Sequence, residues 1–109
     1  FFWATWCPSC SQDFETAKKI YPKYSDKVAF LAIDLDLSEN SEQIRKYGEQ
    51  KGLNKIELAQ GREEILSDYQ IIHTTTKYAI GKNGQIIYKG SGPFTENQWD
   101  ILLNGLVNS

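Results

Sequence analysis

The chain is short of cysteine and histidine, it lacks an excess of charge of one sign, and it has no long apolar run. Its 109 residues hold two cysteines and one histidine, too few for the four ligands of a structural zinc site. No hydrophobic stretch is long enough to span a bilayer. A formal net charge of -2 with mixed signs offers no basic stripe, so the sequence excludes a nucleic-acid partner. The length predicts a single domain over residues 1–109.

Both cysteines lie in one motif, Trp6-Cys7-Pro8-Ser9-Cys10. If a helix begins at or just after Cys7, the two sulfurs lie on one face and can form a disulfide. The N–H groups and dipole of that helix start favour the thiolate of Cys7, which is the candidate nucleophile. Cys10, further in and less exposed, is the candidate resolving thiol. A purely stabilising disulfide is the alternative, but so short a loop removes little entropy from the unfolded chain.

Apolar spacing and turn signals divide the rest of the chain into helices and strands. Helical patterns cover residues 11–24, a segment from a cap at Asn40 to Gly52, residues 62–69, and a closing helix after a capping box at Thr95. Strand patterns cover residues 28–35, 56–59, 78–80 and 85–88, and Asn83-Gly84 predicts a hairpin between the last two. Asp34 and Asp36, near the end of the strand 28–35, are expected to be solvent-facing charges.

The stretch Phe2-Trp3-Ala4-Thr5-Trp6-Cys7-Pro8-Ser9-Cys10 resembles the active-site signature of the thioredoxin superfamily. It is most similar to the branch of membrane-tethered thiol-disulfide oxidoreductases known as TlpA-like or ResA-like, and the resemblance covers nearly the whole chain. It implies an α/β thioredoxin-like fold, with a central mixed β-sheet flanked by helices and the TlpA-like insertion in the middle of the chain. The chain opens inside the first strand of that fold, so we expect an N-terminally truncated domain.

The same resemblance implies a thiol-disulfide oxidoreductase that acts on protein thiols and disulfides, as in cytochrome c maturation, and that requires no cofactor. It implies an extracytoplasmic, membrane-anchored protein, although a C-x-x-C pair also operates in the cytoplasm. We expect a monomer. Trp6 and Pro8, beside Cys7, and the pair Thr74 and Thr75 are the residues expected to contact the substrate.

Two positions depart from the thioredoxin pattern. Thioredoxins place a cis proline just before the strand that faces the C-x-x-C, and the matching residue here is Thr75. Because a cis bond costs about 3 kcal/mol outside proline, we expect a trans bond and a loop of different shape. In ordinary thioredoxin, the acid that accepts a proton near the thiols lies in the strand before the motif, and the matching residue here is Phe1. The ResA-like branch instead often has a glutamate three residues beyond the second cysteine, and the matching residue here is Asp13. Asp13 is therefore either the proton acceptor for Cys10 or a surface aspartate at a helix start.

His73 supports a second hypothesis. The stretch from His73 to Gly84 is similar to a loop and strand of the Sco-type copper chaperones, which bind copper with two cysteines and one histidine. The matching residues are Cys7, Cys10 and His73, and two thiolates with an imidazole suit Cu(I). The alternative function is thus a copper chaperone or copper-site assembly factor, although Sco proteins space their cysteines as C-x-x-x-C. A peroxidase is a third alternative, but the threonine and arginine that activate the peroxiredoxin cysteine are absent.

Overall fold

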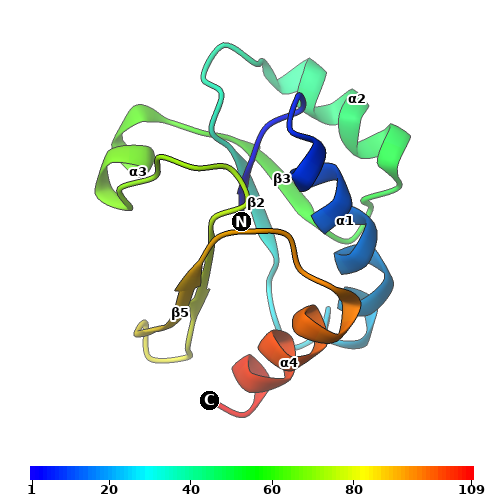
Figure 1. The fold of residues 1–109 in the computed structure, drawn as a ribbon, viewed down its shortest axis with the longest axis vertical. Helices are drawn as coiled ribbons and strands as arrows, with labels where there is room; N and C mark the ends of the chain where they lie inside the picture. Colours follow the sequence, from blue (N-terminus) through cyan, green and yellow to red (C-terminus); the bar gives the residue numbers. More distant parts are fainter.

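A computed structural model describes all residues from 1 to 109. In chain order the elements are β1 (Phe2–Trp3), α1 (Pro8–Ile20), the 3-10 helix η1 (Tyr21–Lys23), β2 (Leu31–Asp34), α2 (Ser41–Lys51), β3 (Glu57–Gln60), α3 (Glu63–Asp68), β4 (Lys77–Ile80), β5 (Ile86–Gly90) and α4 (Glu96–Val107). In Figure 1, α1 and α2 lie on the right of the view, α4 lies at the bottom and α3 lies on the left. None of the helices has both the length and the apolar character needed to cross a membrane.

The strands form a mixed sheet, as the sequence predicts. β1, β2 and β3 are parallel and lie in that order, and β4 pairs with β5 as an antiparallel hairpin. Phe2 joins the two parts, because it forms an antiparallel bridge with Thr76 in which the Phe2 N–H donates to the Thr76 carbonyl at 2.9 Å. The loop before β4 is therefore fixed beside the strand that leads to the cysteine motif.

Helix ends lie where the local signals place them. Asn40 and Thr95 each form a capping box, with Gln43 and Gln98 respectively, and these side chains satisfy the first free N–H groups of α2 and α4. Gly52 ends α2 with φ 70°, a left-handed conformation that glycine adopts without steric cost. The hairpin turn is also confirmed, with Gly84 at φ 81°.

Several element limits differ from the prediction. The helix expected over 11–24 is α1 (Pro8–Ile20) followed by η1, and β4 and β5 begin at Lys77 and Ile86 rather than at residues 78 and 85. β2 begins at Leu31 rather than at residue 28, because β1 and β3 offer partners only to Leu31–Asp34. β3 is displaced by one residue from the predicted 56–59. The helix expected over 62–69 shortens to α3, and its apolar side chains Ile65 and Leu66 are only half-buried.

An aromatic core holds α1 against the sheet. The ring centroids of Trp3 and Phe14 lie 5.2 Å apart, edge to face, and Tyr47 of α2 lies 4.8 Å from Trp3. Trp3 and Phe14 are completely buried. Such pairs each contribute about 0.5–1.5 kcal/mol beyond the burial of their area. This packing fixes the position of α1 directly after β1, and so fixes the N-terminus of α1 at the carboxyl end of the sheet.

Candidate active site

The cysteine motif sits at the first turn of α1. Pro8 is the first helical residue, where its missing N–H costs nothing, and Cys7 is the N-cap in an extended conformation. Cys7 and Cys10 form a disulfide, with Cα atoms 5.3 Å apart, and the Cys10 N–H donates to Cys7 Sγ at 3.1 Å. Cys7 is 4% exposed and Cys10 is 0% exposed. Cys10 is thus the less exposed of the two cysteines, as predicted.

The turn before Cys7 is held by two acidic side chains. The indole N–H of Trp6 donates to Asp36 Oδ2 at 2.8 Å, while 61% of the Trp6 side chain remains exposed. The Thr5 N–H donates to Glu39 Oε1 at 3.0 Å, and the Thr5 hydroxyl bonds to the same carboxylate. Pro8 is exposed as well. Two of the predicted substrate-contacting residues, Trp6 and Pro8, therefore form the exposed rim around Cys7.

Asp34 is completely buried, so the expectation of a solvent-facing charge is wrong. It lies in the central strand β2, and the chain after β2 folds back so that the Asp36 N–H donates to Asp34 Oδ1 at 2.8 Å. Burial, and then the hydrogen bond with the Glu39 carboxyl, raise the pKa of Asp34 to about 8. Burial opposes ionisation of Glu39 too, but hydrogen bonds from Asp34 and Thr5 lower its pKa. Asp34 is therefore largely protonated at neutral pH, whereas Glu39 is ionised.

Asp13 is also completely buried, which excludes the surface-aspartate alternative. Its Oδ2 pairs with Lys77 Nζ at 2.8 Å, and its Oδ1 accepts the Phe94 N–H at 2.6 Å. Burial raises the pKa of Asp13, although Lys77 and the Phe94 N–H act in the opposite direction. Burial likewise lowers the pKa of Lys77, against the attraction of Asp13. Asp13 lies one helical turn from Cys10, the spacing at which side chains share a helix face.

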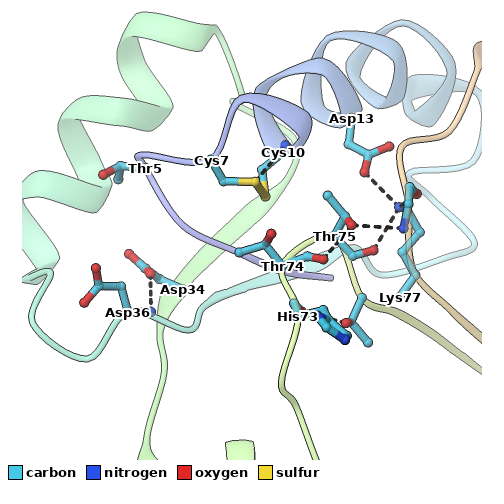
Figure 2. Close-up of a disulfide and its surroundings, with 12 residues drawn as sticks. Thr5, Cys7, Cys10, Asp13, Asp34, Asp36, His73, Thr74, Thr75 and Lys77 are labelled. Carbon is cyan, nitrogen blue, oxygen red and sulfur yellow. Dashed lines mark hydrogen bonds and ion pairs between the residues drawn. A yellow bond between two sulfur atoms is a disulfide. The ribbon is translucent and has the colours of Figure 1, made fainter.

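The loop before β4 lies across from the disulfide (Figure 2). The structure has no cis peptide bond, which confirms the trans bond expected before Thr75. Thr75 has φ 62°, in the left-handed region that β-branched residues rarely adopt. Its N–H donates to the Phe2 carbonyl at 2.8 Å, and its side chain is buried. Thr74 is half-buried on the same loop. The structure thus places Thr74 and Thr75 beside the cysteine pair.

His73 does not join the cysteines. It is exposed, and Figure 2 shows its side chain on the far side of the loop from the disulfide. No group of three His, Cys, Asp or Glu side chains is arranged to hold a metal ion. The copper set predicted from Cys7, Cys10 and His73 is not assembled here, because the cysteines bond to each other and the histidine faces solvent.

Sequence reasoning missed Lys77 and Glu39. For Lys77 a signal was available, since it stands two residues before Ala79 in β4, and residues two apart on a strand share a face. Both are buried. For Glu39 no local pattern distinguishes it from the exposed acids nearby, because its partner Thr5 is 34 residues away.

The chain is similar to known proteins of the same architecture. The curated thiol-disulfide oxidoreductase ResA of Bacillus thuringiensis subsp. konkukian is 31% identical over 107 residues, which is 97% of this chain and 61% of that protein. The crystal structure of StoA from Bacillus subtilis matches 93% of this chain and 77% of its own, with a TM-score of 0.79 and 24% identity. The exposed lipoprotein thioredoxin of Streptococcus pneumoniae matches 96% and 81%, with a TM-score of 0.70 and 23% identity.

These matches confirm the thioredoxin-like fold. The chain spans 61% of the length of the ResA protein, so that protein's activity does not transfer to it directly. None of these matched proteins supports the resemblance of the His73 loop to the Sco proteins. The family model described as Redoxin matches residues 1–103, nearly the whole chain. On this match, the chain belongs to the Redoxin family.

Proposed function

We propose that this domain is a thiol-disulfide oxidoreductase that exchanges disulfides with protein partners through Cys7 and Cys10. The observation that carries the proposal is the position of the pair. It lies at a helix N-terminus, with Cys7 as the N-cap and 4% exposed, and with Cys10 in the first helical turn and 0% exposed. A helix N-terminus stabilises a thiolate at its cap, and the Cys10 N–H already points at Cys7 Sγ.

In the proposed reaction, the Cys7 thiolate attacks one sulfur of a partner disulfide. A Cys7–partner bond forms, the partner disulfide breaks, and one partner thiolate leaves with the electron pair. Cys10 then loses its proton and attacks Cys7 Sγ, which closes the Cys7–Cys10 disulfide and releases the second partner thiolate. Two electrons have passed from the domain to its partner. The reverse sequence oxidises a partner dithiol, and either direction uses sulfur atoms alone, so the cycle requires no cofactor.

Asp13 is the proposed acceptor of the Cys10 proton. It is buried on the helix turn below Cys10, and each of its oxygens retains a lone pair beyond the bonds to Lys77 and Phe94. Its raised pKa supports this role, because a base works best when its pKa approaches the working pH. The role applies only to the second step, since Cys7 attacks as a thiolate that the helix start already stabilises.

The exposed residues around Cys7 support a protein as the disulfide partner. Trp6 and Pro8 are exposed on either side of Cys7, and Thr74 and Thr75 lie across from the disulfide (Figure 2). Together they offer a surface on which a polypeptide can lie against Cys7. An extracytoplasmic, membrane-anchored setting, a monomeric state and a contribution to cytochrome c maturation belong to the same proposal. The likeness to an exposed lipoprotein thioredoxin supports the setting.

A redox titration tests the function. The protein is equilibrated in buffers of reduced and oxidised dithiothreitol, quenched with iodoacetamide and weighed by mass spectrometry. We expect two populations, a doubly alkylated dithiol and an unalkylated disulfide, whose ratio changes tenfold per about 30 mV, as a two-electron couple requires. The Cys7→Ser variant should show one adduct at every potential. A wild-type pair that stays oxidised throughout would show a structural disulfide and contradict the proposal.

A further inference from the structure

Lys77 is the only buried lysine or arginine in the chain. Its side chain is 2% exposed, and burial of an ammonium costs several kcal/mol unless its three N–H donors find acceptors. All three do. Nζ donates to Asp13 Oδ2 at 2.8 Å, to the Gly92 carbonyl at 2.7 Å and to the Thr75 carbonyl at 3.0 Å. The ammonium is therefore completely satisfied, and its position is determined by its acceptors.

Those acceptors belong to separate segments that border the site. Asp13 is on α1, Gly92 is in the connection from β5 to α4, and Thr75 is in the loop across from the disulfide. A second contact joins the last two segments, because the Gly92 N–H donates to Thr75 Oγ1 at 3.0 Å. One side chain thus ties the cysteine helix and two loops together.

Aromatic rings shield this junction from water. Nζ lies 4.4 Å from the ring centroid of Phe94 and 5.4 Å from that of Trp99, within the range of cation–π attraction. The rings offset part of the desolvation cost. They also strengthen the hydrogen bonds of the ammonium, because fewer water molecules compete for the same acceptors.

The Thr75 conformation needs such a restraint. A β-branched residue at φ 62° costs on the order of 1–3 kcal/mol, and it persists only where its surroundings impose it. Three contacts do so here. The Thr75 N–H binds the Phe2 carbonyl, Thr75 Oγ1 accepts from Gly92, and the Thr75 carbonyl accepts from Lys77. Of these, only the contact with Lys77 fixes the direction of the Thr75 carbonyl.

We propose that Lys77 is a positioning residue for disulfide exchange, which holds the Thr74–Thr75 loop in the shape that an extended polypeptide needs to lie beside Cys7. This inference rests on the proposed function and adds a determinant of its substrate class. Lys77 acts through the loop and not on the reacting sulfurs. Its loss should therefore impair reaction with polypeptide disulfides far more than reaction with a small disulfide that needs no loop.

The test compares two probes in a Cys10→Ser background, where Cys7 is the only thiol. One probe is an extended peptide with a single cysteine, activated as its mixed disulfide with thionitrobenzoate, and the other is dithiobis(nitrobenzoate). In each case Cys7 Sγ bonds to the probe sulfur, the probe S–S bond breaks, and thionitrobenzoate leaves with the electron pair and absorbs light. The quantity measured is the ratio of the two second-order rate constants.

Lys77→Met should lower the peptide-to-small-disulfide ratio about tenfold or more, the effect of losing one or two hydrogen-bonding groups. Because Lys77→Met leaves Asp13 buried without its partner, Asp13→Asn/Lys77→Met is measured as well, against Asp13→Asn. The ratio should fall by the same factor in this charge-free pair. Lys82→Met removes an exposed lysine from the hairpin turn and should leave the ratio unchanged.

An unchanged ratio in Asp13→Asn/Lys77→Met, or an equal fall in Lys82→Met, would overturn the proposal while the proposed function stood. Failure of both probes to react with the Cys10→Ser parent would instead contradict the proposed function itself. The two failures are therefore distinguishable in one series of measurements.

Discussion

The carboxyl of Asp34 makes the stability of this protein depend on pH. Its folded pKa is about 8, whereas its ordinary value is 3.8, so the folded chain binds the proton more tightly than the unfolded chain does. Stability falls wherever the folded state holds more protons and the pH rises. The contribution of Asp34 is therefore fully favourable below its unfolded pKa, near pH 4, and is lost as the pH rises through about 8.

We expect Asp34→Asn to remove this dependence. The amide cannot ionise, and its N–H can still donate to Glu39, so the variant should gain stability over wild type at pH 8 and little at pH 4. Urea denaturation at several pH values measures the difference. The matched control is Asp36→Asn, since Asp36 is half-exposed and its pKa is lowered, chiefly by Ser38 and Trp6. Parallel pH profiles for wild type and Asp34→Asn would contradict the raised pKa of Asp34.

The role proposed for Asp13 confines its effect to one step of the proposed reaction. Asp13→Asn should slow release of the Cys7 mixed disulfide by about a hundredfold, because Cys10 then lacks its proton acceptor. The first attack by Cys7 should keep its rate. Stopped-flow detection of the two thiols released from an activated peptide disulfide separates the steps. Equal slowing of both steps, or of neither, would show that Asp13 has only the structural role of pairing Lys77.

At the scale of elements, the helix caps were the most predictable features. Asn40, Thr95 and Gly52 act within their own turns, so a few neighbouring residues determine the outcome. Strand limits were less predictable. The apolar pattern from residue 28 does not reveal that β1 pairs with only the last part of that run, since the partner is distant in sequence.

The cap of α4 provides an element-scale prediction. Thr95→Ala removes the hydroxyl that accepts the Gln98 N–H and should lower the free energy of unfolding by about 1 kcal/mol. Urea denaturation measures this loss. Asn97→Ala, an exposed substitution in the same turn, is the control and should have a much smaller effect. If the two variants were equally stable, the capping box would contribute nothing.

The whole molecule brings together segments that the sequence keeps apart. The Cys7–Cys10 pair could be predicted because both cysteines lie within one helical turn. The resemblance of their motif to thioredoxins indicated the fold. The ion pair of Asp13 and Lys77 spans 64 positions, and the contact of Thr5 with Glu39 spans 34. Neither contact follows from a pattern within a few residues, although the alternation along β4 indicates the buried face on which Lys77 lies. The structure was needed to show that Asp13 is buried and that Asp34 is not a surface charge.

The roles of the two cysteines can be tested most directly by trapping. Reduced Cys10→Ser and Cys7→Ser proteins are each mixed with an excess of a peptide disulfide, quenched with acid and analysed by mass spectrometry. Cys10→Ser should accumulate a stable Cys7–peptide mixed disulfide within the time in which wild type completes its turnover. Cys7→Ser should form almost none, because Cys10 is completely buried. Rapid capture by Cys7→Ser with none by Cys10→Ser would contradict the assignment of Cys7 as the attacking thiol.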